Sequence, residues 1–188
     1  ITASDSANCN GEQNGFATVA ATGGATPYTY LWNDVSAQTT LTAANLAAGT
    51  YTATVTDSNG CVALALVTIG EPDVLAYNPA ITNPSCFAAC DGTTGVAVSG
   101  GTTPYSYIWD DPGTQSAATA TGLCDGTYTV VITDDHGCID IAVLVITEPT
   151  QMSAVASATD VSCTGLCDGS ATVSTSNAVG ATTYQWDD

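Results

Sequence analysis

Short stretches of alternating polar and apolar residues run along the chain, separated by turns rich in Gly, Asp and Pro. The clearest stretch is Thr127–Thr133, where Tyr128, Val130 and Ile132 fall on one face. Alternation with a period of two predicts a half-buried β-strand. Residues 73–149 show this pattern several times and are predicted to form six or seven short antiparallel strands. The predicted strands are Val74–Ile81, Thr93–Ser99, Tyr105–Trp109, one or two weak strands over Ser116–Thr121, Thr127–Thr133 and Ile139–Thr147.

The pattern repeats along the chain with a period of 77. Trp32, Trp109 and Trp186 are evenly spaced at this period, and no insertion breaks the spacing elsewhere. A fixed period identifies tandem structural units. We therefore divide the chain into repeat 1 (residues 1–72, first strand incomplete), repeat 2 (residues 73–149) and repeat 3 (residues 150–188, the first part of a repeat). The same spacing holds for Cys9, Cys86 and Cys163, for Cys61 and Cys138, for Glu71-Pro72 and Glu148-Pro149, and for Gly23-Gly24 and Gly100-Gly101.

Six or seven short strands with regular turns predict an all-β fold, namely tandem immunoglobulin-like antiparallel sandwiches. Trp109 on the third strand and Tyr128 at the start of a later strand occupy positions that this architecture buries. Pro104 and Pro149 flank strands and do not interrupt them, as strand pairing requires. We therefore interpret the recurring aromatic residues as core residues.

Composition excludes several functions. The 188 residues contain no Lys or Arg, and the formal net charge is −18. A nucleic-acid-binding protein needs cations to neutralise phosphate, so that function is excluded. No apolar stretch is long enough for a membrane helix, so membrane insertion is not expected. Eight cysteines without a Cys-x-x-Cys motif indicate disulfides formed in an oxidising compartment. The sequence therefore predicts a secreted segment.

Comparison of the repeats predicts one disulfide directly. Repeat 2 contains Cys90 and Cys124, where repeat 1 has Gln13 and Ala47. Because both cysteines are lost together, and because both positions fall at the same end of the predicted sandwich, we expect Cys90 to pair with Cys124.

The partners of the other cysteines stay open. Cys9, Cys61, Cys86 and Cys138 pair either within one repeat or between repeats. A bond within a repeat is the usual arrangement, but Cys86 and Cys138 fall at opposite ends of the predicted sandwich. Since a disulfide needs Cα atoms within about 7 Å, a bond from Cys9 to Cys138 between consecutive repeats is the alternative.

Few residues are candidates for binding chemistry. Asp91 and Asp125 follow the paired Cys90 and Cys124, so two carboxylates are expected close together. One interpretation is that they bind Ca²⁺, which would balance their negative charge in a chain that has no Lys or Arg. The alternative is that they cap turns by accepting hydrogen bonds from backbone N–H groups. The single His136 lies in a turn with no nucleophile beside it, so no catalytic residue and no required cofactor are predicted. Ser6, within Asp5-Ser6-Ala7, is a weak match to a short O-glycosylation motif.

The repeat resembles the SprB-type repeat of bacterial gliding-motility surface adhesins. The residues that carry the resemblance in repeat 2 are Cys86, Asp91-Gly92, Gly100-Gly101, Pro104-Tyr105, Tyr107, Trp109, Gly126-x-Tyr128, Thr133-Asp134, Gly137-Cys138 and Ile146-x-Glu148-Pro149. Repeat 3 departs from the pattern, with Asn177-Ala178 in place of the Gly pair and Ala181-Thr182 in place of Pro-Tyr. The resemblance implies very large secreted proteins on the bacterial outer surface, and it implies no catalytic residues.

The sequence thus predicts a structural or adhesive extracellular protein without enzymatic activity, a segment of a surface adhesin or filament stiffened by disulfides. Its expected partners are neighbouring repeats, other copies in a fibre and surface glycans. The alternative is a carbohydrate- or protein-binding module appended to a larger secreted enzyme. An exposed aromatic platform at equivalent positions, for which Tyr28 and Tyr105 are the candidates, would favour that alternative.

Overall fold

The computed structural model describes residues 1–187, and over that range the chain forms β-strands and no helix. None of the described segments is therefore a helix that could cross a membrane. The contacts divide the chain into two compact units. One comprises Ile1–Asn78, Val98–Tyr107 and Val131–Ile141, and the other comprises the remaining residues. The boundary passes through repeat 2, so the compact units do not coincide with the sequence repeats.

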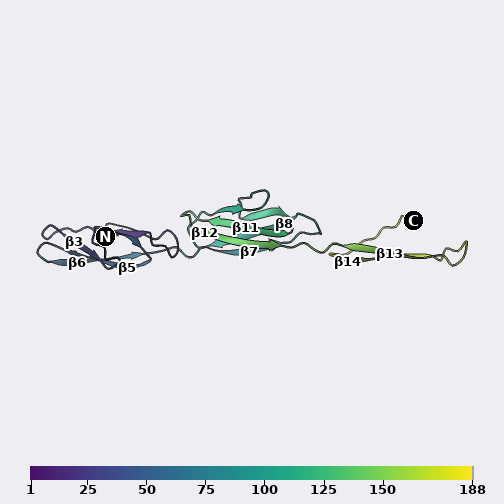
Figure 1. Ribbon diagram of the computed structural model, residues 1–188, viewed down its shortest axis with the longest axis horizontal. Coiled ribbons are helices and arrows are strands. Elements are labelled where there is room, and N and C mark those ends of the chain that lie inside the picture. The colour runs from purple at the N-terminus through teal and green to yellow at the C-terminus, as the bar shows by residue number, and fades with distance from the viewer. Residues whose placement is uncertain (188) are drawn as a thin grey trace. The chain divides into compact units, whose positions relative to one another are not determined.

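Repeat 1 folds into two three-stranded antiparallel sheets (Figure 1). The first sheet has the order β1-β2-β4 and the second has the order β3-β5-β6. Strands one, two and four share one sheet, and strands three, five and six share the other, which is the strand order of an immunoglobulin-like sandwich. The strands are β1 (Ala3–Asp5), β2 (Gly15–Thr18), β3 (Thr29–Trp32), β4 (Thr42–Leu46), β5 (Gly49–Thr56) and β6 (Val62–Ile69).

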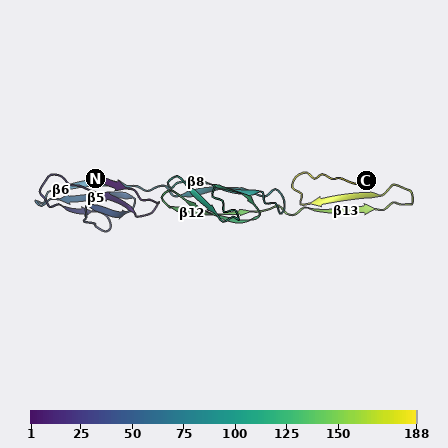
Figure 2. The same ribbon diagram turned by 90° about the horizontal axis from the view of Figure 1, so that it is seen from above.

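Repeat 2 has the same strand order, with sheets β7-β8-β10 and β9-β11-β12 (Figure 2 labels β8 and β12). One strand, β10, stands where the sequence predicted one or two weak strands, and it begins later than predicted. It runs from Thr119 to Leu123 because Ala120 and Leu123 supply its buried side chains. The strands are β7 (Ala76–Thr82), β8 (Gly92–Ser99), β9 (Ser106–Trp109), β10 (Thr119–Leu123), β11 (Gly126–Thr133) and β12 (Ile139–Ile146).

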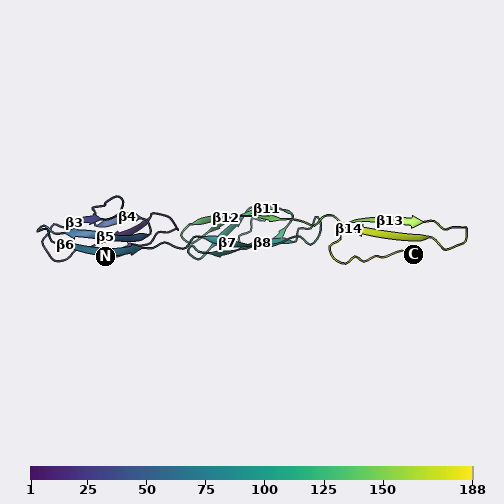
Figure 3. The ribbon, with the colours of Figure 1, turned by 90° about the horizontal axis from the view of Figure 1, so that it is seen from below.

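Repeat 3 contributes one antiparallel hairpin, in which β13 (Ser153–Thr159) pairs with β14 (Ser170–Ser176) (Figure 3). The pairing runs without a bulge from Ser153 opposite Ser176 to Thr159 opposite Ser170. Trp186, the equivalent of the core tryptophans, is 51% exposed.

Trp32 lies at the centre of the repeat 1 core and is only 1% exposed. It shares the buried cluster with the small residues Ala17, Ala43 and Ala53, whose short side chains leave room for the indole ring. The indole N–H donates to the Thr40 carbonyl at 3.0 Å, so its polar group is satisfied inside the core. In repeat 2 the buried Trp109 makes the same bond to Ala117 at 2.8 Å.

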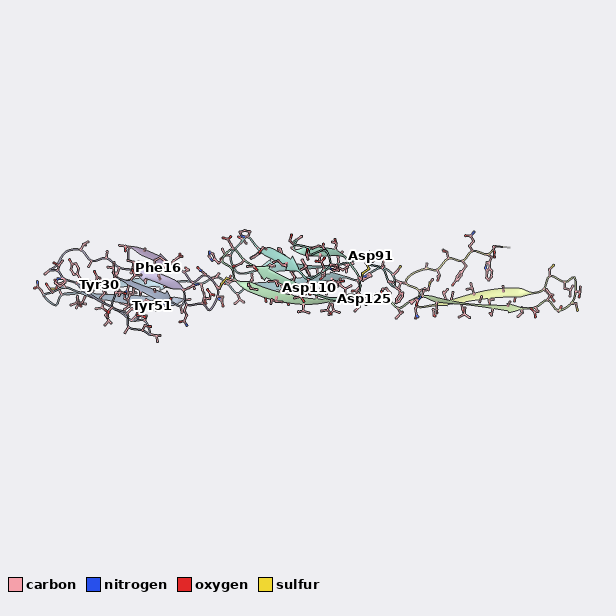
Figure 4. All side chains as sticks on the ribbon, turned by 45° about the horizontal axis from the view of Figure 1, so that its top comes forward. Phe16, Tyr30, Tyr51, Asp91, Asp110 and Asp125 are labelled. Carbon is pink, nitrogen blue, oxygen red and sulfur yellow. A yellow bond between two sulfur atoms is a disulfide. The ribbon has the colours of Figure 1, made fainter. Side chains whose placement is uncertain are left out.

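A tyrosine near the start of the fifth strand is anchored in both complete repeats. The Tyr51 hydroxyl donates to the Ala47 carbonyl at 3.0 Å, and the Tyr128 hydroxyl donates to the Cys124 carbonyl at 3.2 Å. A hydrogen bond from this tyrosine to the backbone a few residues upstream is the tyrosine corner of immunoglobulin-like sandwiches. Tyr51 and Tyr30, from the neighbouring strand, both pack against the core of repeat 1 (Figure 4).

Candidate functional site: the inter-repeat disulfide

Cys9 of repeat 1 and Cys138 of repeat 2 form a disulfide, with Cα atoms 5.7 Å apart. We call this bond the inter-repeat disulfide. Both cysteines belong to the same compact unit. The sequence left open whether Cys9 and Cys138 pair within one repeat or between repeats, and in the structure they pair with each other between repeats. The expectation that Cys61 and Cys86 are paired as well is not met within residues 1–187, where both are exposed free thiols.

The turn that contains Cys9 is held by the end of its own repeat. The Gly11 N–H donates to a Glu71 carboxylate oxygen at 2.6 Å, and the Asn10 side chain donates to the Pro72 carbonyl at 3.0 Å. A carboxylate that accepts a backbone N–H makes a strong, charge-assisted hydrogen bond. Glu71 thus fixes the turn from which Cys9 reaches its partner.

The same clamp recurs one period later, where the Ala88 N–H donates to Glu148 at 2.6 Å. Sequence reasoning used Glu71-Pro72 and Glu148-Pro149 only as markers of the period and missed this function. Their regular spacing from Cys9 and Cys86 was the available signal.

An aspartate organises the hairpin that presents Cys138. One oxygen of Asp134 accepts the N–H groups of His136 at 2.9 Å and Cys138 at 2.8 Å. The other oxygen accepts the N–H of Thr102 at 2.7 Å. Burial raises the pKa of Asp134, but these three donors outweigh it and hold the pKa below its ordinary value. The cysteine is therefore positioned by an ionised carboxylate.

Asp57 does the same for Cys61 in repeat 1. It accepts the N–H groups of Ala25, Asn59 and Cys61 at 2.8–3.0 Å. The N–H groups of Ala25 and Cys61 are the main causes that lower the pKa of Asp57. Gly24 lies against this carboxylate, because a Cβ there would come within 2.8 Å of an Asp57 oxygen, and its φ of +68° is itself unfavourable for other residues.

The wild-type protein should lose the contribution of Asp134 as pH falls. A lowered folded pKa means that the stabilisation is present above the unfolded Asp pKa of about 3.9 and disappears as pH falls through the folded value. The Asp134→Asn variant lacks the carboxylate, so its melting temperature should lie below that of wild type at pH 7 and converge on it toward pH 2. Melting curves across this range measure the gap. Asp135→Asn, at the exposed neighbouring position, is the control and should melt with wild type; a constant gap for Asp134→Asn would contradict the assignment.

His136 lies beside the inter-repeat disulfide. Its Nδ1 is 3.3 Å from the Asn8 carbonyl oxygen and 3.3 Å from the Thr102 hydroxyl. The imidazole thus lies between the turn before Cys9 and the turn at Thr102. The Sγ atom of Cys138 lies 3.4 Å from the same Asn8 carbonyl and, being in a disulfide, packs against it without donating a hydrogen.

The second disulfide joins Cys90 to Cys124, the pair that their joint loss from repeat 1 predicted. Asp91 and Asp125, which follow these cysteines, lie at the same end of the repeat 2 strands (Figure 4). Asp91 accepts the N–H and the hydroxyl of Ser85, at 2.9 and 2.6 Å, and these bonds lower its pKa. Asp125 is exposed.

The contact made by Asp91 does not depend on its charge. In repeat 1 the neutral Asn14 accepts the Asn8 N–H at 2.8 Å from the equivalent position. In repeat 3 Asp168 accepts the Ser162 N–H at 2.9 Å. Within residues 1–187, no three His, Cys, Asp or Glu side chains gather in a group able to hold a metal ion.

The loop before the fourth strand is held by a pair of residues that the sequence did not reveal as partners. Asp111 accepts the backbone and side-chain N–H groups of Gln115, at 2.9 and 3.0 Å, and that glutamine in turn bonds both backbone groups of Thr121 at 3.0 Å. Asp34 and Gln38 repeat the arrangement in repeat 1. Asp111 therefore has a structural partner and holds this loop.

The two tyrosines that are candidates for an aromatic platform are half-buried, and their hydroxyls are hydrogen-bonded. Tyr28 packs against the core of repeat 1, and its hydroxyl donates to the Gly23 carbonyl. The Tyr105 hydroxyl donates to the Gly100 carbonyl at 2.6 Å, and its ring is half-buried. These tyrosines fasten the glycine turn to the strand that follows it. Ser6, the weak glycosylation candidate, is exposed.

An apolar row on β6 is exposed instead. Val62, Leu64 and Leu66 are 61–66% exposed on this edge strand, which pairs only with β5 in its sheet. The equivalent residues of β12 are also exposed apolar residues, namely Ile139, Ile141 and Val143, and Val145 extends the row where repeat 1 has Thr68. Aliphatic side chains repeated on an outer face are a feature of surfaces that contact other molecules. We call Val62, Leu64 and Leu66 the β6 apolar row.

A family model described as "SprB repeat" matches residues 1–37, 78–114 and 155–188, which together make up more than half of the chain. The chain belongs to the SprB repeat family. The starts of the three matched segments are separated by the same period of 77 as the tryptophans and cysteines. Each SprB match ends shortly after the core tryptophan or at the end of the chain, so the Glu-Pro clamp and the Cys138 hairpin lie outside the matched segments.

Solved structures with immunoglobulin domains resemble the SprB repeats only distantly. An amphioxus IgVJ-C2 molecule is 14% identical over 72% of this chain and 96% of its own, with a TM-score of 0.35. A structure on Dscam isoform specificity is 12% identical (64% and 38% covered, TM-score 0.33). The N-terminal four Ig domains of Dscam1 isoform 9.44 are 13% identical (79% and 44% covered, TM-score 0.32). The chain spans less than half the length of both Dscam chains. No curated protein matches the chain.

Proposed function

We propose that this chain is a structural and adhesive segment of a bacterial cell-surface adhesin or filament, located outside the cell and of the kind that serves gliding motility. The observation that carries the proposal is the inter-repeat disulfide, which links one SprB repeat covalently to the next. An enzyme would need a group of activated side chains, and the only histidine contacts a backbone carbonyl and a threonine hydroxyl. Repetition suits a structural role, because each added unit lengthens the array.

The inter-repeat disulfide changes how tension passes along the chain. Because Cys9 and Cys138 are 129 residues apart in sequence, a force applied at the two ends crosses directly from one sulfur to the other. The residues between them are not stretched, even when their sandwiches unfold. A surface fibre with this connection resists extension without depending on the stability of its domains.

Pulling single molecules by their ends tests this role. At up to about 3.5 Å per extended residue, reduction should lengthen the fully unfolded wild-type chain by about 450 Å, since 129 residues join the stretched path. The Cys9→Ser variant keeps only the Cys90–Cys124 bond, with a separation of 34, and should lengthen by about 120 Å. A wild-type gain near 120 Å would mean that no bond joins the repeats and would remove the basis of the proposal.

The β6 apolar row supports the adhesive part of the proposal. A chain with a net charge of −18 and no Lys or Arg is repelled by anionic surfaces. Its contacts with such surfaces must therefore rest on uncharged groups, and the row offers three aliphatic side chains at alternate positions of one strand. We assign this row to contact with apolar material.

Adsorption to alkyl-coated and to bare, anionic glass measures this contact. Replacing Leu64 and Leu66, together with their counterparts Ile141 and Val143, with Thr should reduce adsorption to the alkyl surface several-fold and leave the small adsorption to glass unchanged. Thr68→Val, which copies Val145 of repeat 2, is the matched gain-of-function variant and should increase adsorption. Equal adsorption of all three proteins to the alkyl surface would show that adhesion uses another face.

A further inference from the structure

Cys86 occupies the position of Cys9 in the next repeat, and its turn is built in the same way. The Ala89 N–H donates to the Cys86 carbonyl at 3.1 Å, as the Glu12 N–H does to the Cys9 carbonyl at 3.2 Å. Glu148 clamps this turn as Glu71 clamps the first one. The geometry that aims Cys9 at its partner is thus present around a thiol that is exposed and free within the described residues.

A hollow of about 410 Å³ lies beside Cys86, lined in part by Phe87, Gln151 and Met152. The equivalent hollow beside Cys9, of about 510 Å³, is lined by Asn10, Val74 and Leu75 and also by the hairpin residues Gly137, Cys138 and Ile139. Val74 and Leu75 stand one period before Gln151 and Met152. The two hollows thus share the cysteine turn and the residues that follow the Glu-Pro pair. The hollow beside Cys86 is closed by Asn177, Ala178, Val179, Ala181 and Thr182, where the hollow beside Cys9 is closed by the hairpin of the following repeat.

Cys61 presents the other half of the same connection. It lies one period before Cys138, on a hairpin held by Asp57 as the later hairpin is held by Asp134. The Asp57–Cys61 and Asp134–Cys138 contacts are both 2.8 Å. Cys61 is exposed and free within residues 1–187.

We propose that Cys86 and Cys61 form inter-repeat disulfides with further SprB repeats. Cys86 bonds the cysteine at the Cys138 position of a following repeat, and Cys61 bonds the cysteine at the Cys9 position of a preceding repeat. Each bond forms when two thiols reduce an oxidised dithiol donor, such as a disulfide-donating oxidoreductase or glutathione disulfide. One S–S bond forms, the donor's S–S bond breaks, and two protons and two electrons pass to the donor.

The resulting bonds interleave. Each spans 129 residues, which exceeds the period of 77, so the bond from Cys86 begins before the bond from Cys9 has ended. Tension that reaches Cys138 needs to follow only the short stretch of backbone from Cys138 to Cys163, the next cysteine of the Cys9 type in that path. A second path, through Cys86, runs in parallel. The inference rests on the proposed array, and it makes that array a covalent ladder in which unfolding extends only the short backbone stretches between successive disulfides.

Completing repeat 3 tests Cys86. Asp188 is equivalent to Asp111, so adding a copy of residues 112–149 after it continues the period of 77. The copy of His136 is replaced by Asn, as at Asn59, so that its peptide differs in mass from that of Cys138. Cys90 and Cys124 are both replaced by Ser, so that Cys86 is the only cysteine in the peptide released by cleavage at Asp and Glu. The extended protein is oxidised with glutathione disulfide, alkylated, cleaved at Asp and Glu, and mapped without reduction.

We expect alkylation of Cys86 to fall from nearly complete in the 188-residue chain to nearly none in the extended protein, with its peptide joined to the copied Cys138 peptide. A bond between Cys167 and the copied Cys124 shows that repeat 3 has folded. If that bond forms while Cys86 remains alkylated, the proposal is overturned.

A second variant tests Cys61 without relying on repeat 3. A copy of residues 1–77, with its own Cys61 replaced by Ser so that every Cys61 peptide comes from the original position, is placed before Ile1 and supplies a preceding repeat in the same period. Its cysteine at the Cys9 position should join Cys61 and protect it from alkylation. Alkylation of Cys61 in this protein, with the Cys9–Cys138 bond intact, would overturn the proposal while leaving the proposed function of the chain itself in place.

Discussion

Replacing both Cys9 and Cys138 with Ser should lower the free energy of unfolding by about 5 kcal/mol. A cross-link stabilises the folded state by restricting the unfolded chain, and the effect grows with the length of the closed loop. The separation here is 129 residues, which gives about 5 kcal/mol in the chain-entropy model. Denaturant unfolding followed by tryptophan fluorescence measures the change, because Trp32 and Trp109 are both buried within the loop.

The Cys90→Ser, Cys124→Ser double variant is the matched control. Its loop has a separation of only 34 residues, so the same model gives about 4 kcal/mol. The effect of this variant should be confined to repeat 2, because repeat 1 has Gln13 and Ala47 at these positions. A larger loss from the control than from the Cys9–Cys138 variant would contradict the long loop.

Replacing Trp32 with Ala should cost about 3–5 kcal/mol, because it removes the largest side chain of the core and leaves a cavity. The ring is 1% exposed and lies among alanines that are too short to fill the space. The truncation also leaves the Thr40 carbonyl without its indole donor. Thermal or denaturant unfolding of the repeat 1 transition measures the loss.

Trp186→Ala is the control for this variant, since the same residue type at the same position of the period is 51% exposed in repeat 3. Its replacement should change stability by less than about 1 kcal/mol. Similar losses for both variants would mean that the tryptophan contributes through local strand preference and not through burial.

The sequence was a good guide to the fold because its informative residues recur. Trp32 and Trp109 marked the third strand of each complete repeat. The alternation over Thr127–Thr133 located a strand that in the structure begins one residue earlier, at Gly126. The Cys90–Cys124 pair could be predicted because both residues change together between repeats. Periodicity thus supplied the comparison that an alignment would otherwise provide.

The partner of Cys9 could not be decided in the same way. Both candidate partners, Cys61 and Cys138, recur with the period, so the spacing does not distinguish them. The pairing of Cys9 depends on which turn of repeat 1 contacts the Cys138 hairpin of repeat 2. Such a contact between two folded repeats cannot be deduced from the positions of strands in the sequence.

The polar contacts around the disulfide were missed for a related reason. Glu71 reaches Gly11 from 60 residues away, and Asp134 reaches Thr102 from 32 residues away. Such contacts depend on turn geometry and on positive φ values, such as that of Gly101 beside Asp134. The partners of the half-buried Tyr28 and Tyr105 could not be predicted either, because their hydroxyls bond backbone carbonyls, which the sequence does not distinguish.

Mapping the disulfides of the oxidised 188-residue protein tests the central claim most directly. The chain contains no Lys or Arg, so it must be cleaved at Asp and Glu, which separates Cys9, Cys61 and Cys138 into different peptides. The structure predicts that the Cys9 peptide is joined to the Cys138 peptide and that Cys61 is alkylated. A peptide joining Cys9 to Cys61 would show that each repeat closes on itself and would contradict the covalent link between repeats.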